Sequence, residues 1–530
     1  MLKKTGWFLI FCAVLGTVGE LCKIDFPTVR FPFSVSRNIG ILHAGTGDGA
    51  LPWFGWLLTI LTLLAGVWMS IHFAHGARFT PITLRRIERF KSIKRGYYSL
   101  LIIVFLAALA SLDHLLVGKE PLLVSHKGEW SFPAFTRGVE KGDAFGLTGD
   151  RGQSPPNYRK LKEQFKESDE GWMILPLVPY DPTGDSITAV STEIKVDGDK
   201  LIEGKKPFQG LAAYLYDIRV PERMHLRYTY RAGVRQGQVD GWDEDGNYIY
   251  NGKYQAGKLV EGSEKWNGEG ALADFLAKQS SGPREVHFPA TPPSFTKGQR
   301  HLIGTNSSGY DVLAYLFGGL QVNFKAALVY IPIVYFVGIS IGLLMGFFGG
   351  TFDLLFQRVI EILSNIPFLF VVMIASTAVP EKLKETAGLW MILGILLMFG
   401  WMGMTYVMRT AALKEKSRDY IAASRVIGAS TPRILFRHLL PNSLAIIVTL
   451  IPFSVSGLVL SLTSLDYLGF GLPSSYATWG QLLQDGLQNL SKPWLVSSSF
   501  FMLVCFLTLI TFVGEAVREA FDPKKFSYYR

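Results

Sequence analysis

Residues 417–442 have the sequence SRDYIAASRVIGASTPRILFRHLLPN and lie between two long apolar runs. Ser417 can cap the start of a helix, and Gly428 can end that helix in the left-handed conformation. The pair Thr431-Pro432 is typical of the N-cap and the first position of a second helix. The pattern therefore predicts two short helices that meet at a sharp angle.

The middle of this stretch combines small residues with many positive charges. Ala422, Ala423 and Ser424 would let another protein approach the backbone of the first helix closely, as when a helix sits in a partner's groove. The surrounding loop, residues 409–441, carries seven basic residues against two acidic ones. A short loop rich in Lys and Arg beside apolar runs is typical of the cytoplasmic side of a membrane. Taken one at a time, its arginines are expected to be solvated or to contact lipid headgroups.

Apolar runs long enough to cross a bilayer lie on both sides of this loop. The overall composition, 49% hydrophobic residues with a net charge of +10, would also fit a soluble protein. About 20 helical residues cross the hydrocarbon core, and inside lipid the backbone must satisfy its own hydrogen bonds, so these runs should be helices. The basic surplus lies in loops beside the runs, which favours a membrane surface over nucleic acid. From residue 97 onward we expect six spans, at about 97–117, 322–347, 367–379 with a start near Leu363, 389–408, 443–462 and 495–513.

Residues 1–96 form an N-terminal extension with two further apolar runs, at about 7–21 and 52–74. The first run is short and follows two lysines, so it fits either a retained span, which we prefer, or a cleaved signal peptide. The loop after the second run has seven basic residues against the single acid Glu88, which places it in the cytoplasm. Both basic loops agree with one orientation, in which the C-terminus is also cytoplasmic.

Residues 118–320 form a long polar region between the first and second of the six spans. Its acidic and basic residues nearly balance, so it lacks the positive-inside signal and should lie outside, in the periplasm. Turn-forming pairs separate short alternating stretches, which predicts a β-rich insertion. These pairs are Asp197-Gly198, Asp245-Gly246 and Asn251-Gly252.

The loop 409–441 resembles a segment shared by the permease subunits of ATP-binding-cassette (ABC) importers. Their pattern is Glu-Ala-Ala, three residues, Gly, nine residues and Ile-x-Leu-Pro, and every spacing is kept here. It falls on Ala422, Ala423, Ser424, Gly428, His438, Leu440 and Pro441. Ala422 replaces the Glu, Ser424 replaces an Ala and His438 replaces the Ile. Loss of the Glu puts a salt bridge from that position to an ATPase in doubt, but it leaves the docking helix intact.

Other stretches resemble the branch of this family that imports oligopeptides, dipeptides or nickel. They are residues 302–319, 361–370, 461–473 and 514–525, and the His at 438 is also typical of the peptide importers. Within the branch, PLLVSHKGEWSFP at 121–133 is most similar to the Yej-type peptide permeases, which are associated with microcin C uptake. We identify this resemblance over residues 95–135 and about 285–526.

The resemblance implies an all-α polytopic membrane protein with a six-helix core of the type I ABC importer. Its parts would be the first core span at 97–117, the periplasmic insertion at 118–320 and five spans with the coupling loop at 321–530. Two extra N-terminal spans would precede this core. Such a chain would form half of a translocation pathway for peptides across the bacterial inner membrane.

The resemblance also implies partners. These are a second permease subunit in a heterodimer, two ATPase subunits or one fused ATPase, and a periplasmic substrate-binding protein. The external segments 302–319 and 464–494 would be candidates for contacting that binding protein. ATP and magnesium would belong to the ATPases, with no cofactor and no metal in this chain.

The residues themselves argue in the same direction. A phosphate-binding P-loop needs Gly-x4-Gly-Lys followed by Ser or Thr, and no Gly-Lys pair in this chain has that hydroxyl, so the chain is not expected to be an ATPase. An ion-coupled transporter, the first alternative, needs buried ionisable groups in its spans, and the middles of the last five runs lack Asp, Glu, Lys and Arg. The second alternative is a membrane-anchored envelope scaffold that acts through residues 136–285. Gly342, Gly346 and Gly350 are expected to serve close helix packing.

Overall fold

The computed structural model describes residues 2–22, 52–72, 81–135, 140–146, 156–168, 170–183, 190–204, 206–217, 224–244, 247–268, 270–278, 282–287, 290–295, 300–379, 381–473 and 476–522. The chain divides into two compact units. The first comprises Met1–Leu116, Tyr315–Gln488 and Val496–Arg530, and it is helical. The second comprises Val117–Ala314 and Asn489–Leu495, and it contains all the strands that the structure describes.

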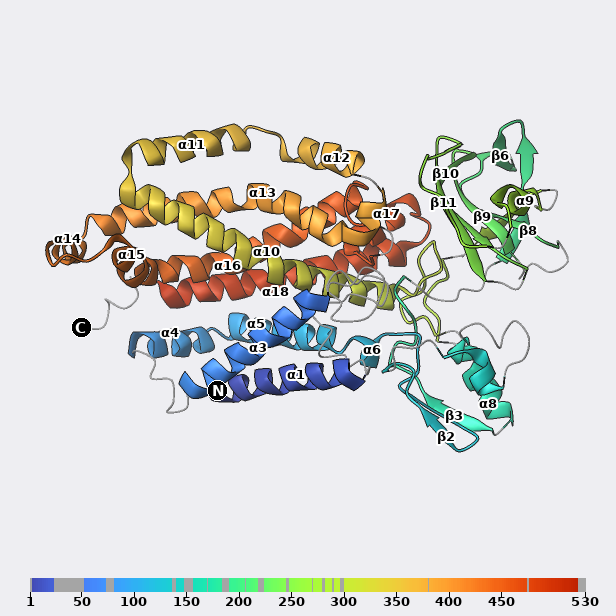
Figure 1. The fold of residues 1–530 in the computed structure, drawn as a ribbon, viewed down its shortest axis with the longest axis horizontal. Helices are drawn as coiled ribbons and strands as arrows, with labels where there is room; N and C mark the ends of the chain where they lie inside the picture. Colours follow the sequence, from blue (N-terminus) through green and yellow to red (C-terminus); the bar gives the residue numbers. More distant parts are fainter. Residues whose placement is uncertain are drawn as a thin grey trace. The chain divides into compact units, whose positions relative to one another are not determined.

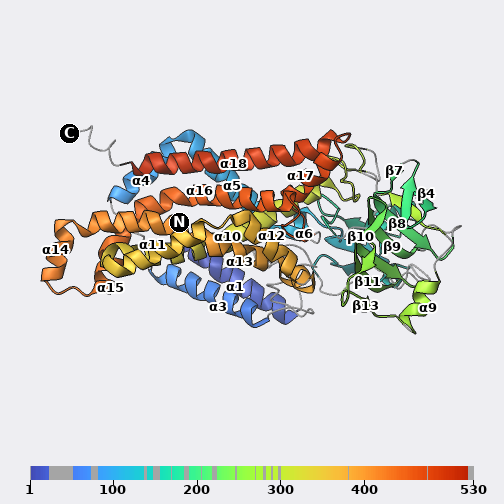
Figure 2. The same ribbon diagram turned by 90° about the horizontal axis from the view of Figure 1, so that it is seen from above.

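Four long apolar helices run side by side in the helical unit (Figure 1, Figure 2). They are α10 (Val312–Phe348), α13 (Glu381–Lys416), α16 (Leu440–Tyr467) and α18 (Pro493–Phe521). Among the described residues, these four are long and apolar enough to cross a membrane, and up to six spans result if each of two bent helix pairs is one span. The predicted fold class, a polytopic α-helical membrane protein with a β-containing insertion, is therefore confirmed.

Two helix pairs are bent, and the second bend has a local cause in the sequence. Helices α4 (Pro81–Ser92) and α5 (Lys94–Ser111) meet at 92°, at the single non-helical residue Ile93. Helices α11 (Gly350–Ser364) and α12 (Phe368–Ala378) meet at 71°. Pro367 precedes α12, and a proline disfavours helical backbone at the residue before it. The run predicted as one span near 363–379 is thus the second half of a broken one.

Small residues let several helices approach closely. The N-terminal helices α1 (Leu2–Cys22) and α3 (Pro52–His72) meet at Gly6 and Gly66, where a Cβ on Gly66 would lie 2.9 Å from the Gly6 carbonyl oxygen. Gly342 and Gly346 of α10 lie equally close to α13, as predicted. The packing role expected for Gly350 is wrong, because its φ of +58° places it in the turn between α10 and α11, with open space around it.

Three buried ionisable residues lie at the edges of the predicted runs or between them, outside the middles that are free of Asp, Glu, Lys and Arg. Lys325 lies in the first half of α10 and is only 4% exposed. Asp353 in α11 and Asp466 in α16 are also buried, near the ends of their helices. Buried charges are therefore present in the helical unit, although they are few.

The β-containing unit holds three antiparallel sheets. Strands β2-β1-β3 form one, β5-β6-β7 form another, and an eight-stranded sheet has the order β12-β11-β10-β9-β8-β14-β4 with β13 paired to β11. Their bounds are β1 Leu123–His126, β2 Glu129–Ser131, β3 Gly171–Ile174, β4 Val190–Glu193, β5 Lys195–Asp197, β6 Lys200–Glu203, β7 Lys206–Pro207, β8 Gly210–Leu215, β9 Met224–Arg231, β10 Val234–Trp242, β11 Tyr248–Gln255, β12 Lys258–Leu259, β13 Lys265–Trp266 and β14 Arg284–His287. Short helices complete the described elements of this unit: η1 Gly142–Phe145, α8 Tyr158–Ser168 and α9 Leu272–Ala277. The four-residue helix α6 (Asp113–Leu116) precedes it.

The small sheet β2-β1-β3 has two different faces. Val124 and Met173 point to one face and pack with Leu161 and Phe165 of α8 in a buried cluster. Trp130 and Trp172 lie on the opposite face, both across from Ser125, and are 64% and 48% exposed. The sheet therefore has a buried face under α8 and an exposed aromatic face.

The turn predictions had mixed outcomes. Asp197-Gly198 lies at the β5–β6 connection, with Gly198 at φ +58°, as predicted. Asp245-Gly246 lies outside the described residues. The prediction for Asn251-Gly252 is wrong, because both residues lie inside β11 and pair with β10.

Three other tight hairpins use Ala-Gly or Lys-Gly pairs. Both central residues have positive φ at Lys127-Gly128, Ala232-Gly233 and Ala256-Gly257. A two-residue turn of this kind requires that conformation, and glycine supplies the second position at no steric cost.

Candidate functional site

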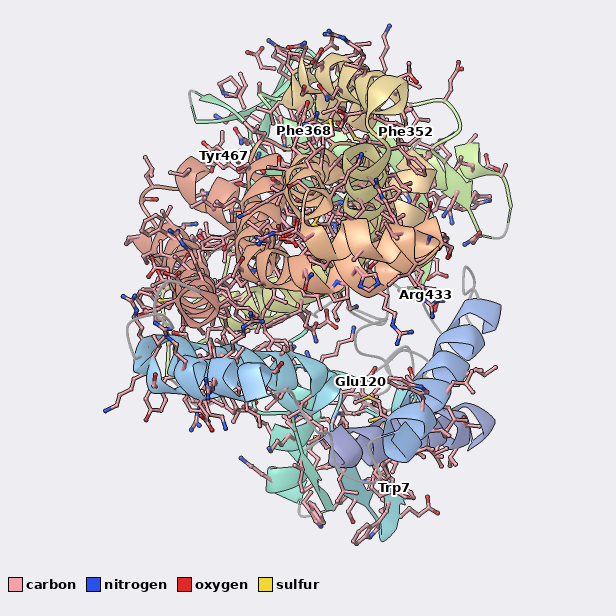
Figure 3. All side chains as sticks on the ribbon, turned by 90° about the vertical axis from the view of Figure 1, so that its left-hand side faces the viewer. Trp7, Glu120, Phe352, Phe368, Arg433 and Tyr467 are labelled. Carbon is pink, nitrogen blue, oxygen red and sulfur yellow. The ribbon has the colours of Figure 1, made fainter. Side chains whose placement is uncertain are left out.

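The segment singled out from the sequence forms an elbow at one end of the helical bundle. It consists of α14 (Asp419–Val426), α15 (Thr431–Ile434) and a π-helical turn, η2 (Leu435–Leu439), between α13 and α16. In two perpendicular views, α14 and α15 lie at the end of the bundle opposite α17 (Trp479–Gln488) (Figure 1, Figure 2). Figure 3 looks onto this end, with Arg433 of α15 labelled.

The first helix of the elbow ends as predicted but begins differently. Gly428 has φ +82°, and its N–H donates to the Arg425 carbonyl at 2.9 Å. The Ala429 N–H donates to the Ser424 carbonyl at 3.0 Å, which completes a Schellman-type end. The predicted cap Ser417 is wrong: the N-cap is Arg418, and the Ser417 hydroxyl donates back to the Lys414 carbonyl. The end of α13 competes successfully for that hydroxyl.

The second helix of the elbow continues into the next span. The residue before α15 is Ser430 rather than Thr431, and Pro432 lies in its first turn as predicted. Helix α15 then runs through η2 into α16, so residues 431–467 form one continuous helix and not a separate short one. Pro441 lacks an N–H and would clash with the carbonyl four residues earlier, and the wider π-turn just before it relieves that clash.

Buried contacts hold α14 against the bundle. Ile421 is 0% exposed and packs among core residues of α10, α13 and α16. The Tyr420 hydroxyl donates to the Glu415 carboxylate at 2.7 Å and accepts from the Asn442 side chain at 2.7 Å. The Tyr420 ring also lies 6.3 Å from the His438 ring. One face of α14 is therefore fixed to both α13 and the start of α16.

The end of α10 receives two cations from the elbow and its flank. Lys416 donates a hydrogen bond to the Phe347 carbonyl, in the last turn of α10. Arg425 of α14 stacks over the Phe347 ring at 5.1 Å from its centroid. Arg425, expected to be only solvated or lipid-facing, thus links α14 directly to α10. Positive charge is also favourable beside the carbonyl end of a helix.

The opposite face of α14 has no partner within the described residues. Ala422 and Ala423 are exposed, and Val426 and Ile427 are 88% and 85% exposed. Two large apolar side chains at a helix end, flanked by small residues, form a surface that another protein can cover. We name residues 422, 423, 426 and 427 the apolar tip.

The remaining residues of the predicted motif have structural roles. Ser424 bonds within α14, where its hydroxyl donates to the Tyr420 carbonyl at 2.7 Å. His438 and Leu440 are partly buried on either side of the fully buried Leu439. The Ala-Ala-Ser and Gly positions of the motif thus lie on α14 and at its end, and the His-x-Leu-Pro positions lie at the start of α16. Tyr420 of α14 joins the two parts through its contacts with Asn442 and His438.

A bidentate ion pair braces this end of the bundle, and sequence reasoning missed it. The Arg409 guanidinium of α13 donates to both carboxylate oxygens of Asp353 in α11, at 2.6 and 2.7 Å. The two side chains are only 24% and 11% exposed. Asp353 stands shortly after Gly349-Gly350 in the sequence, but its partner Arg409 lies 56 residues away, so the sequence alone does not indicate the pair.

The other end of the helical unit is locked by α17. The Trp479 indole N–H donates to the Leu316 carbonyl of α10 at 2.9 Å, and Tyr315 donates to Gln481 at 2.8 Å. Asp466, at the end of α16, accepts a hydrogen bond from the Leu472 N–H at 2.7 Å and so closes the loop after α16. Among the described residues, no group of three or more His, Cys, Asp or Glu side chains could hold a metal ion. One end of the helical unit is thus held by hydrogen bonds from α17, and the other end carries the elbow with its exposed apolar tip.

Comparisons with known proteins fit this arrangement. Residues 338–527 match a family described as the binding-protein-dependent transport system inner membrane component. The chain is 30% identical over 447 residues to the peptidoglycan transport system permease protein YejE of Agrobacterium fabrum, a match that covers 84% of this chain and 94% of that protein. It is 28% identical over 449 residues to the inner membrane ABC transporter permease protein YejE of Escherichia coli, covering 85% and 99%. It is 31% identical over 238 residues to the oligopeptide transport system permease protein OppC of Bacillus subtilis, covering 44% and 73%.

The extent of the first two matches corrects the sequence interpretation. We identified the resemblance only over residues 95–135 and about 285–526, whereas a match to 84% of the chain also includes much of the rest. The reason is that these other segments carry no short motif, so their likeness is visible only in a full-length comparison.

Proposed function

Since this chain belongs to the family of inner-membrane permease subunits of ABC transporters, we propose that it forms half of a pathway that imports peptides across the bacterial inner membrane. The names of its relatives support peptide-type cargo, because they include oligopeptide, dipeptide and peptidoglycan transport systems. Peptides and peptide-bearing cell-wall fragments share amide and carboxylate groups. Uptake of microcin C stays a prediction.

The observation that carries the proposal is the one-sided anchoring of α14. Ile421 and Arg425 fix one side of this helix to the bundle, while Val426 and Ile427 are almost fully exposed on the other. We infer that an ATPase subunit covers the apolar tip and moves α14 when it binds ATP. The bundle would then change between inward- and outward-facing states by rigid-body rocking.

The proposal includes the remaining partners and the orientation. A second permease subunit would complete the pathway, two ATPases or one fused ATPase would bind ATP and magnesium, and a periplasmic binding protein would deliver the peptide. The elbow and the C-terminus would lie in the cytoplasm and residues 118–320 in the periplasm, because both basic loops fall on one side under that arrangement. Family membership argues against the ion-coupled alternative, since the energy source is then a separate ATPase.

The test is co-purification with the ATPase subunits of its own transport system. Burying Val426 and Ile427 contributes roughly 3–6 kcal/mol in total, so Val426→Asp/Ile427→Asp should reduce recovery of the ATPase at least tenfold. Val196→Asp, which changes a 60% exposed residue of β5, is the matched control and should leave recovery unchanged. Gly428→Pro should also reduce it, because proline cannot adopt the positive φ or supply the N–H that ends α14.

Two outcomes would contradict the proposal. One is an ATPase that remains bound to the Val426→Asp/Ile427→Asp variant as well as to the unaltered chain. The other is equal loss in the Val196→Asp control, which would indicate general misfolding instead of a docking surface. Melting temperatures of all variants in detergent, measured beside the recovery, separate these cases.

A further inference from the structure

A cavity of about 550 Å³ lies in the β-containing unit, at some distance along the chain from the elbow. Helix α8 forms one wall, residues 175–180 form a second, and residues of the segment 300–313 form the third. All its lining residues belong to the same compact unit. None of them belongs to the apolar tip.

Chain connectivity ties the cavity to two apolar helices. Leu313, which lines it, lies in the first turn of α10, the 37-residue helix that crosses the bilayer. Val178, which also lines it, bridges to Val117, and the Gly118 N–H donates to the Val178 carbonyl at 3.1 Å. Val117 directly follows α6, which follows α5 after a single residue. Two walls of the cavity are thus attached within a few residues to apolar helices.

The cavity has more positive than negative charge. It is lined by four basic side chains, Arg159, Lys162, Lys166 and Arg300, against the two acidic ones Glu163 and Asp311. Asp311 is already engaged, because its carboxylate lies 2.9 Å from His301 Nδ1 and accepts from the Ala314 N–H at 2.8 Å.

Three of the four cations form no ion pair within the part of the chain that the structure describes, although Glu163 also lines the cavity. They are Lys162, Lys166 and Arg300. Burial, and then the neighbouring Lys166 charge, lower the pKa of the Lys162 ammonium. A bound anion would relieve this repulsion.

Neighbouring groups fix the orientation of Arg159, the fourth cation, without a bound anion. The Arg159 guanidinium donates to the Pro179 carbonyl at 2.7 Å and stacks over the Tyr180 ring at 4.5 Å. The Tyr180 ring in turn lies 4.4 Å from the ring of His301. A guanidinium with a fixed plane is well suited to bind phosphate oxygens.

The rest of the lining is apolar and partly open. Leu177 is 81% exposed and Leu302 is 47% exposed, although both line the cavity. Exposed leucines beside a cationic recess fit an amphipathic ligand better than a small hydrophilic ion. The same feature favours a lipid over an acidic peptide, which would leave these leucines in water.

We propose that this cavity binds the phosphate group of an anionic phospholipid, with Arg159, Lys162 and Arg300 around the phosphate and Leu177 and Leu302 against the acyl chains. The shared chemistry is a phosphate ester, and we take the membrane as its source because two walls of the cavity connect within a few residues to apolar helices. Such a site would hold the β-containing unit against the lipid surface.

The test uses the full chain, purified and stripped of lipid in detergent. Phosphatidylglycerol is titrated in mixed micelles, and bound lipid is counted by native mass spectrometry. Each basic residue near an anionic surface strengthens binding by about fivefold. Lys162→Gln/Arg300→Gln should therefore weaken phosphatidylglycerol binding by roughly 25-fold, with phosphatidylcholine bound weakly throughout.

Matched variants and competitors make the result decisive. Lys160→Gln/Arg231→Gln removes two exposed charges outside the cavity, one of them on α8 itself, and should leave binding unchanged. If the double variant at 162 and 300 fails to fold, Lys166→Glu against Lys160→Glu gives the same comparison at exposed positions.

Three results would overturn the inference. The first is equal phosphatidylglycerol binding in the cavity variant and its control. The second is a site that takes soluble glycerol 1-phosphate with the same dependence on Lys162 and Arg300 but ignores the lipid. The third is displacement of the lipid by the acidic dipeptide Ala-Glu at the same concentration, which would identify a peptide site. None of these measurements involves the ATPase, so they leave the proposed import function to its own test.

Discussion

Replacing Ile421 with alanine should release α14 from the bundle without changing its apolar tip. Ile421 is 0% exposed in the core cluster of the helical unit, and truncating such a side chain costs about 2–5 kcal/mol. The other anchors of α14 are the hydrogen bonds of Tyr420 and the stacking of Arg425, at about 1 kcal/mol each. An eight-residue helix is not stable alone in water, so its docking depends on these contacts. Ile421 therefore supplies the largest single share of the anchorage.

Amide hydrogen exchange over residues 419–428 of the purified chain measures this directly. A loss of about 3 kcal/mol should speed exchange there by about 100-fold, because these amides exchange when α14 opens. Ala423→Gly is the control: it is exposed and lowers helix propensity by about 1 kcal/mol, which predicts about a fivefold change. Equal acceleration in the two variants would refute the view that Ile421 holds the elbow. Under the proposed function, Ile421→Ala should also reduce ATP hydrolysis stimulated by peptide more than it reduces ATPase recovery.

Three further predictions concern stability, each measured by thermal melting of the full chain in detergent. Asp353→Asn should destabilise the chain by about 3–5 kcal/mol, because it leaves the mostly buried Arg409 without its carboxylate. The double variant Asp353→Asn/Arg409→Gln should recover part of this loss. No recovery would mean that this ion pair does not brace the bundle. Gly471→Ala should destabilise the chain, because an added Cβ would lie 1.9 Å from a carboxylate oxygen of Asp466. Gly394→Ala should not, because nothing lies within 4 Å of its added Cβ. Similar melting temperatures of the two variants would contradict the structure of the loop after α16. Burial lowers the pKa of His225 from 6.5 to about 4, so unfolding takes up a proton and the free energy of unfolding should fall by roughly 3 kcal/mol as the pH drops from 6.5 to 4. His225→Phe should flatten this pH dependence. If the variant keeps the same pH dependence, other groups cause it.

The parts of the fold that were predicted from sequence are those that depend on local chemistry. A long apolar run must be helical in lipid whatever surrounds it, so the last five predicted runs fall on helices. Their bounds differ more, because polar turns extend the helices: α10 begins ten residues before the predicted start at 322, and α18 ends eight residues after the predicted end at 513. The end of α14 at Gly428 was also found, because a positive φ is a property of one residue and its neighbours. The break near Pro367 follows from the same local logic, although the short run was first interpreted as one span.

The parts that were missed depend on residues far apart in the sequence. The Asp353–Arg409 pair joins two helices 56 residues apart, and neither residue alone indicates the other. Asn251-Gly252 has the composition of a turn, but pairing with β10 holds it in a strand. Ser417 had two possible hydrogen-bond partners, and the end of α13 provides the one that it uses. Local preference decided none of these three cases.

The contacts that hold α14 to the bundle limit the force that this helix can pass from a partner to the bundle. Covering Val426 and Ile427 would contribute roughly 3–6 kcal/mol. The inner contacts of α14 contribute more, about 5–8 kcal/mol, because Ile421 is joined by two hydrogen bonds of Tyr420 and the stacking of Arg425 at about 1 kcal/mol each. A partner bound at the tip can therefore pull α14 without detaching it. Under the proposed function, the displacement would reach α10 first, because Arg425 and Lys416 both contact Phe347 at the end of that helix. Beyond Phe347 the chain turns at Gly349-Gly350, where both residues have positive φ and open space, so this junction is the place where the backbone can pivot.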